Sequence, residues 1–131
     1  MTDSAKFDLR KNIPALPQLQ SIEVVEAQEG HVVYTFTPPA EMANYHNNVH
    51  GGMVYTMCEI GAGMVANTLG KDNVAITGSC NYIRKCQIGE PVTVEGTAQH
   101  NGRSTVVVRV VVRNSADKTV AETTFTLFVL Q

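Results

Sequence analysis

Alternation of apolar and polar side chains, which is typical of half-buried strands, runs through most of this chain. Residues 31–37 alternate and are rich in Val, Tyr, Phe and Thr, and residues 104–113 read STVVVRVVVR. β-Branched and aromatic residues are favoured in strands because they pack well on a pleated surface. The same pattern predicts further strands over residues 19–27, 73–85, 91–100 and 119–129.

One long segment, residues 51–69, breaks this alternation and is apolar all around a helical wheel. A helix that is apolar on every side is expected to be buried on every side. Gly70 suits its end, because glycine readily adopts the left-handed conformation that follows many helices. The order of elements predicts one α+β domain over residues 1–131, with an antiparallel sheet wrapped around the helix and an irregular N-terminal arm over residues 1–18.

Composition narrows the possible partners. Charged residues make up only 17% of the chain against 44% hydrophobic residues, which suggests that self-association hides surface. The net charge of -2 argues against nucleic acid, and no apolar run reaches the length of a membrane span. The N-terminal residues lack a secretory signal, and the three cysteines lack metal-ligand spacing. We therefore expect a cytoplasmic protein with reduced thiols and with no metal or other cofactor.

A single carboxylate, Glu59, interrupts the apolar helical segment. An ionised carboxylate in such surroundings costs several kcal/mol unless it is paired, and no Lys or Arg lies within residues 51–70. Glu59 must find donors outside the helix or have a raised pKa, as a general base or nucleophile needs. The alternative is an ordinary glutamate at an exposed helix edge. The neighbouring Cys58 is a conceivable nucleophile, but a buried, unreactive thiol is the favoured interpretation.

The segment His50-Gly51-Gly52 stands directly before this helix. A helix that begins at Gly51 presents unpaired N–H groups, which can hold a carbonyl oxygen as it gains negative charge. His50 can donate a hydrogen bond or a proton near neutral pH, although it can equally be a simple helix cap. Glu59 is expected roughly 12 Å further along the helix axis. Two antiparallel copies of the helix across a dimer axis would bring Glu59 of one chain to His50 of the other.

These residues form a known pattern: an Asn, five residues, His-Gly-Gly, and an acid nine residues after the His. The pattern consists here of Asn44, His50, Gly51, Gly52 and Glu59. With the strands that follow, it resembles the hotdog-fold acyl-CoA thioesterases of the phenylacetate-pathway and 4-hydroxybenzoyl-CoA types. The resemblance extends over about residues 28–130. It implies a hotdog fold and hydrolysis of an acyl-CoA. The site would be shared between the subunits of a homodimer or a dimer of dimers. Residues 104–113 or a neighbouring strand would continue the sheet across the interface.

The resemblance also implies a role for each residue. Glu59 would be the nucleophile or general base, and the Gly51 N–H would polarise the thioester carbonyl. Asn44 and His50 would position the thioester, and Thr77 matches the family's water-holding Ser or Thr. Many relatives have Asp at the position of Glu59, so direct attack and activation of water both stay open. The remaining substrate-binding candidates are Gly52, Ser79, Arg84, Lys85 and Arg103.

Two other functions remain open at this point. A hotdog dehydratase or hydratase also uses a His and a helix acid across a dimer interface, but the Asp-x5-His motif of hydratases is absent. A non-catalytic acyl-CoA binder would not need the acid. The identity of the acyl group cannot be deduced from these residues.

Overall fold

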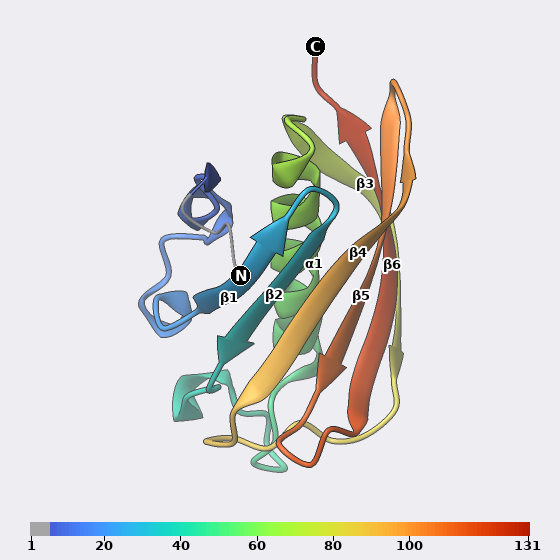
Figure 1. Cartoon of the computed structure of the whole chain (residues 1–131). Coiled ribbons are helices and arrows are strands. Elements are labelled where there is room, and N and C mark those ends of the chain that lie inside the picture. The colour runs from blue at the N-terminus through green and yellow to red at the C-terminus, as the bar shows by residue number, and fades with distance from the viewer. Residues whose placement is uncertain (1–5) are drawn as a thin grey trace.

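One long helix packs against one face of a six-stranded sheet in a computed structural model that describes residues 6–131 (Figure 1). The helix, α1, spans Gly51–Thr68. The strands are β1 (Glu23–Gln28), β2 (His31–Phe36), β3 (Asn73–Tyr82), β4 (Val92–Asn101), β5 (Thr105–Arg113) and β6 (Thr119–Val129). Their order in the sheet is β1-β2-β4-β5-β6-β3, and every neighbouring pair is antiparallel. The predicted sheet around a single helix is confirmed.

The valine-rich strand β5 explains why the helix docks where it does. Val106, Val108, Val110 and Val112 are fully buried, because alternate side chains of a strand point to one face. The neighbouring strand β4 lets the helix come close at Gly96. A Cβ atom there would lie 2.8 Å from a methyl carbon of Val65, which leaves no room for a side chain.

The expectation that α1 is buried on every side is wrong. Gly52 and Glu59 are exposed, and Thr56 and Gly63 are half-buried. These residues recur at helical spacing and form one stripe along the helix, which the rest of the chain leaves partly uncovered. Among the described residues, no helix is both long enough and apolar enough to cross a membrane.

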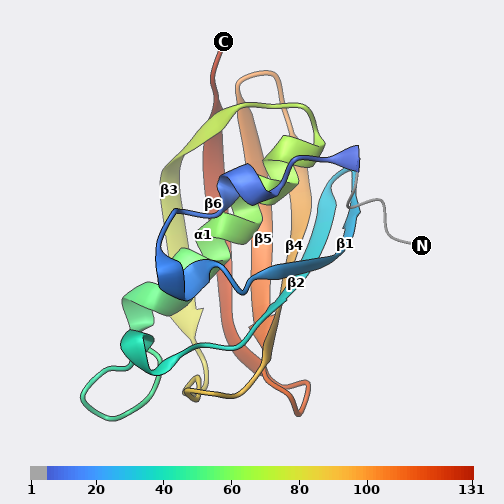
Figure 2. The same cartoon turned by 90° about the vertical axis from the view of Figure 1, so that its left-hand side faces the viewer.

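The N-terminal arm covers part of that uncovered side. It contains two short 3₁₀ turns, η2 (Arg10–Asn12) and η3 (Pro17–Leu19), and crosses the helix on the side away from the sheet (Figure 2). The strand predicted from residue 19 begins only at Glu23, because Pro17 opens η3 and the Leu19 N–H closes a turn onto the Leu16 carbonyl. Residues 1–5 of the predicted arm lie outside the described residues.

The sheet has two free edges, β1 and β3. Strand β5 lies between β4 and β6, and both of those strands also have a partner on each side. The prediction that residues 104–113 or a neighbouring strand extend the sheet across an interface is therefore wrong, since their backbone groups are already paired within the chain.

Candidate active site

The start of α1 leaves one backbone donor available to a ligand. The Gly52 N–H donates to Nδ1 of His50 at 3.0 Å, which makes His50 the cap of the helix. The Gly51 N–H has no acceptor among the described residues. Because Nδ1 accepts a hydrogen bond, the proton of the neutral His50 ring lies on Nε2. The exposed edge of His50 therefore offers an N–H donor next to that of Gly51.

Tyr82, at the end of β3, holds this helix start in place. Its hydroxyl donates to the Gly51 carbonyl at 2.8 Å, and a Cβ atom at Gly51 would lie 3.4 Å from the ring. Partial burial and a hydrogen bond with Cys80 raise the pKa of Tyr82 to about 12, so the hydroxyl remains a donor at neutral pH. No motif in the sequence points to Tyr82, whose only signal is an aromatic side chain near the end of the strand predicted over residues 73–85.

Asn44 lies in the loop that leads into the helix. Its side-chain oxygen accepts the N–H groups of His46 and Asn48 at 3.0 and 3.1 Å, which leaves the side-chain N–H groups free to donate to a ligand. Asn44 borders a cleft of about 290 Å³, which we call the helix-start cleft. Its lining residues are Asn44, Asn48, Val49, Gly51, Val54, Tyr82, Ile83, Arg84, Lys85 and Cys86. The fold thus brings together four of the predicted site residues.

Glu59 borders a different cleft, of about 380 Å³, which we call the Glu59 cleft. It is lined by Asn12, Pro14, Thr56, Glu59, Ile60, Gly63, Asn73, Val74, Ala75 and Leu127. None of the residues of the helix-start cleft belongs to it. One chain therefore has the two halves of the predicted site in separate clefts along one helix, and Glu59 is exposed rather than enclosed by apolar neighbours.

Five predicted residues line neither cleft: His50 and Gly52 flank Gly51, and the other three lie further away. Thr77 directly follows a bulge in β3 and stands opposite Thr126, and it does not line the Glu59 cleft. Ser79 shares a small hollow with Arg109 on the outer face of the sheet. Arg103 lies in the turn between β4 and β5, at the opposite end of the sheet from the start of α1 (Figure 1).

The cysteine next to Glu59 is buried, as the sequence predicts. Burial raises the pKa of Cys58 to about 12, which favours the protonated thiol. The unreactive role of Cys58 stays a prediction.

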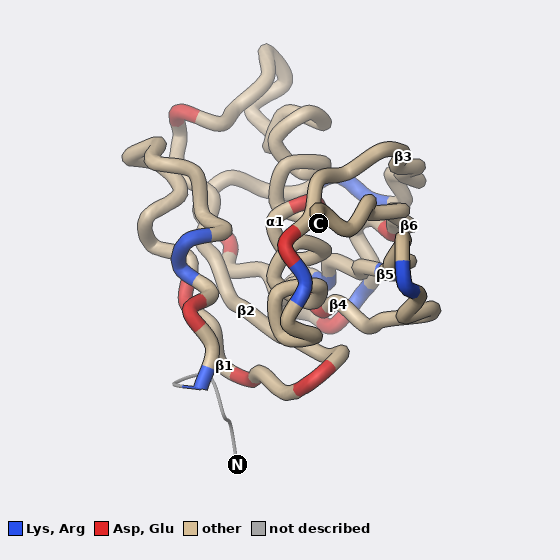
Figure 3. Tube along the Cα trace, turned by 90° about the horizontal axis from the view of Figure 1, so that it is seen from above, with Lys and Arg blue, Asp and Glu red and all other residues tan. Residues whose placement is uncertain are grey.

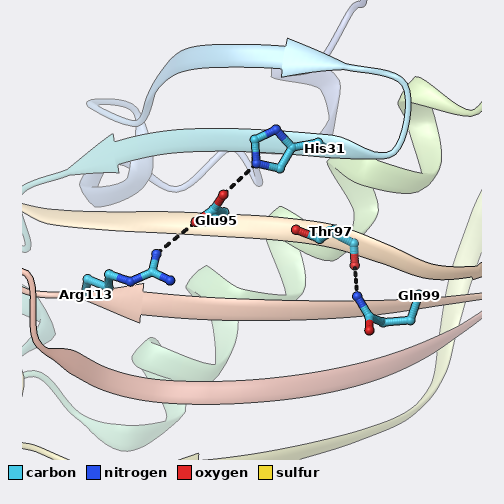
Figure 4. A network of polar contacts seen from close by, with 5 residues as sticks. All are labelled: His31, Glu95, Thr97, Gln99 and Arg113. Carbon is cyan, nitrogen blue, oxygen red and sulfur yellow. Dashed lines mark hydrogen bonds and ion pairs between the residues drawn. The ribbon is translucent and has the colours of Figure 1, made fainter.

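Seen from above, the positions of Lys and Arg and those of Asp and Glu are both spread along the described part of the chain trace (Figure 3). The most connected group lies on the outer face of the sheet, where Glu95 accepts from His31 at 2.6 Å and from Arg113 at 2.9 Å (Figure 4). This group joins β2, β4 and β5 and is remote from α1, which packs on the other face.

Comparisons with known proteins identify the family of the chain. A sequence model of the thioesterase superfamily matches residues 46–121, a segment that includes His50, Gly51 and Glu59 but not Asn44. The acyl-coenzyme A thioesterase PaaI of Escherichia coli K12 is 29% identical over 100 residues, which cover 76% of this chain and 71% of that protein.

Two crystal structures resemble the whole chain. A hypothetical thioesterase from Streptococcus pneumoniae TIGR4, solved with coenzyme A, superposes with a TM-score of 0.87 at 32% identity and covers 94% of each chain. A Streptococcus mutans UA159 protein bound to acetyl-CoA superposes with a TM-score of 0.84 at 32% identity, over 90% of this chain and 95% of that one. The predicted hotdog fold is confirmed.

Proposed function

Because the chain belongs to the thioesterase superfamily, we propose that it hydrolyses an acyl-CoA thioester to the free acid and CoA. Two similar structures contain coenzyme A or acetyl-CoA, which supports a CoA-linked substrate. The helix-start cleft offers N–H donors, and the Glu59 cleft offers a carboxylate, as thioester hydrolysis requires.

The separation of the two clefts is the main support for the proposal that the site is shared between subunits. A continuous helix of 18 residues separates its first residue, Gly51, from Glu59 by roughly 12 Å of axial rise. Neither cleft contains both a carboxylate on α1 and a free helix-start donor. In a symmetric dimer, Glu59 of one protomer meets the partner's Gly51, the partner's His50 and the partner's Asn44, and each dimer then has two complete sites.

Hydrolysis at this shared site can follow two routes. In the first, Glu59 takes a proton from a water molecule, and the water oxygen attacks the carbonyl carbon. In the second, a carboxylate oxygen of Glu59 attacks directly, and water then cleaves the mixed anhydride. In both routes the partner's Gly51 N–H stabilises the oxyanion, the carbon–sulfur bond breaks, and the CoA thiolate leaves and takes up a proton.

The remaining predicted residues have supporting roles in this proposal. Arg84 and Lys85 border the helix-start cleft and suit contacts with CoA phosphates, although Arg84 also donates to the Thr119 carbonyl at 2.7 Å. Gly52 contributes its lack of a side chain rather than its N–H, which His50 already occupies. We retain Thr77 as the candidate water-holding residue, and Ser79 and Arg103 as candidates for contacts with substrate.

Substitution of Glu59 by Gln tests the proposal. The variant keeps the shape of the side chain but removes the base, so kcat for thiol release from an acyl-CoA panel should fall by about 100-fold or more. Glu29→Gln is the matched control, because Glu29 is exposed in the turn between β1 and β2. A folded Glu59→Gln protein that keeps most of the wild-type kcat would contradict the role of Glu59. Conversion of enoyl-CoA without thiol release, or binding without either reaction, would contradict the proposed activity.

A further inference from the structure

The N-terminal arm forms one wall of the Glu59 cleft. Asn12 and Pro14 of the arm line this cleft together with Glu59 and Gly63 of α1. Strands β3 and β6 contribute Asn73, Val74, Ala75 and Leu127 to the same cleft, and the Asn73 side-chain nitrogen already donates to the Lys71 carbonyl at 3.1 Å. A group that extends from a thioester carbonyl at Glu59 into this cleft therefore passes apolar side chains and the amide of Asn12.

A chain of hydrogen bonds fixes the orientation of that amide. The side-chain nitrogen of Asn67 donates to the backbone carbonyl of Asp8 at 2.9 Å, and a carbonyl can only accept. The same nitrogen donates to the side-chain oxygen of Asn12 at 3.0 Å. The oxygen of Asn12 must therefore face Asn67, and its nitrogen must face the other way.

The Asn12 nitrogen lies against α1 at Gly63, and Asn12 lines both the Glu59 cleft and a neighbouring cleft that Asn67 also lines. A Cβ atom at Gly63 would be 3.0 Å from this nitrogen, so the absence of a side chain at Gly63 gives the amide its place. The nitrogen has no acceptor among the described residues. Gly63 is four residues after Glu59, which corresponds to about 6 Å, or one turn of the helix. The side-chain nitrogen of Asn12 is thus an unpaired hydrogen-bond donor about one helical turn beyond the Glu59 carboxylate.

We propose that Asn12 is a specificity-determining residue, which donates a hydrogen bond to an oxygen atom of the acyl group about 6 Å beyond the thioester carbonyl. This inference rests on the proposed function. The enzyme then favours acyl groups that carry such an oxygen over alkyl groups of equal length, because an alkyl group leaves the Asn12 donor without a partner.

Two acyl-CoA substrates of equal length test the proposal. 5-Oxohexanoyl-CoA has a ketone oxygen at the required distance, and hexanoyl-CoA does not. The ratio of their kcat/KM values for wild-type protein should be about ten in favour of the oxo substrate, as one well-placed hydrogen bond provides. The ratio cancels any effect of a substitution that acts on both substrates alike.

Two variants of Asn12 isolate the donor. Asn12→Leu removes it without adding charge, and the ratio should fall to about one, while hydrolysis of hexanoyl-CoA continues. Asn12→Asp keeps an oxygen toward Asn67 but presents an acceptor to the cleft, so the ratio should fall below one even if the Leu variant folds poorly. Lys11→Leu is the matched control, because Lys11 belongs to the same 3₁₀ turn but does not line the Glu59 cleft, and it should keep the wild-type ratio.

The outcomes separate this inference from the proposed function. Two results would overturn the role of Asn12 while the thioesterase activity remains supported. In the first, the wild-type protein releases thiol from both substrates with equal kcat/KM. In the second, both Asn12 variants keep the wild-type ratio of the two kcat/KM values. Absence of thiol release from either substrate, and from the wider acyl-CoA panel, overturns the proposed function and the inference together.

Discussion

The backbone N–H of Gly51 is positioned by two side chains from different parts of the chain. His50 occupies the next N–H along the helix, and the Tyr82 hydroxyl holds the Gly51 carbonyl. An oxyanion donor is effective only when its direction is fixed before the charge develops. Under the proposed mechanism, Tyr82 is therefore a positioning residue, which acts through its hydrogen bond to Gly51.

Replacement of Tyr82 by Phe tests this positioning. The variant keeps the ring against Gly51 and removes one hydrogen bond, so kcat should fall by about 2- to 10-fold with little change in KM. Steady-state kinetics on the best acyl-CoA of the panel measure the effect. Tyr45→Phe is the control, since Tyr45 is 93% exposed. An unchanged kcat, or a change confined to KM, would show that Tyr82 does not position the oxyanion donor.

Residues close in the sequence were easier to predict than residues joined by the fold. The spacing from Asn44 through Gly51 to Glu59 was visible because one loop and one helix carry all of it. Tyr82 was missed because 31 residues separate it from Gly51. The sequence left open whether Glu59 is enclosed or lies at an exposed helix edge, because burial depends on what packs against the helix and a helical wheel does not contain that information.

At the scale of the elements, Glu95 ties β4 to both of its neighbours. Its hydrogen bond with His31, helped by that with Arg113, lowers the pKa of Glu95 below its ordinary value of 4.5. A carboxyl group whose pKa is lower in the folded state stabilises the fold at pH values above 4.5. This contribution is lost as the pH falls through the lowered pKa.

Removal of one partner of Glu95 should reduce this pH dependence. The Glu95 side chain is 33% exposed, so solvent screening limits the contribution to about 1 kcal/mol or less. Arg113→Met should lower the free energy of unfolding at pH 6, and the difference from wild type should shrink at a pH below the lowered pKa. Urea denaturation at the two pH values measures it, with Arg109→Met, which breaks the exposed pair with Glu122, as control. A difference between wild type and Arg113→Met that stays constant with pH would argue against the role of Glu95.

Regular elements followed the sequence patterns closely, and irregular ones did not. Long runs rich in β-branched and aromatic residues located β5 and β6 within one residue at each end, because such runs favour strands. The arm was less predictable. Leu19 and Ile22 are buried as a strand pattern suggests, but a 3₁₀ turn and the chain that follows it bury them instead of a strand. Short apolar stretches next to prolines permit both structures.

At the scale of the whole molecule, β3 is the surface best suited to meet a second copy. This edge strand has ten residues, none of them charged, and its Ile76 side chain is 57% exposed. A long, uncharged edge presents unpaired backbone groups for pairing with another strand. The order of the strands decides which of them is an edge, and no pattern in the sequence specified that order.

Disruption of this edge should separate the subunits. Light scattering at micromolar concentration should give at least a dimer for wild type, and Ile76→Lys should shift it toward the monomer and abolish thiol release with it. Val25→Lys is the matched control, because Val25 is 40% exposed on β1, the other free edge. A wild-type protein that is a stable, active monomer would rule out the shared site.

Mixing of two inactive variants tests the shared site directly. Subunits of Glu59→Gln and His50→Ala are refolded together or expressed together. If the site is shared, a mixed dimer has one site with both lesions and one with neither, so random pairing restores about a quarter of all sites. If each site lies within one chain, activity stays at the mean of the two variants. Mass measurement of the mixed dimers excludes a failure to exchange.

The separation of the two clefts along α1 affects when a newly made protein becomes active. A newly synthesised protomer has a solvated carboxylate at Glu59 and an empty helix start, but no place where both reach the same carbonyl. Under the proposed arrangement, thioester cleavage therefore starts at assembly rather than at folding. In dilute solution most of the protein is monomeric, so the concentration of dimer, and with it the rate of thioester cleavage, should increase with the square of the protomer concentration. A cell that makes little of this protein should therefore have almost none of the activity.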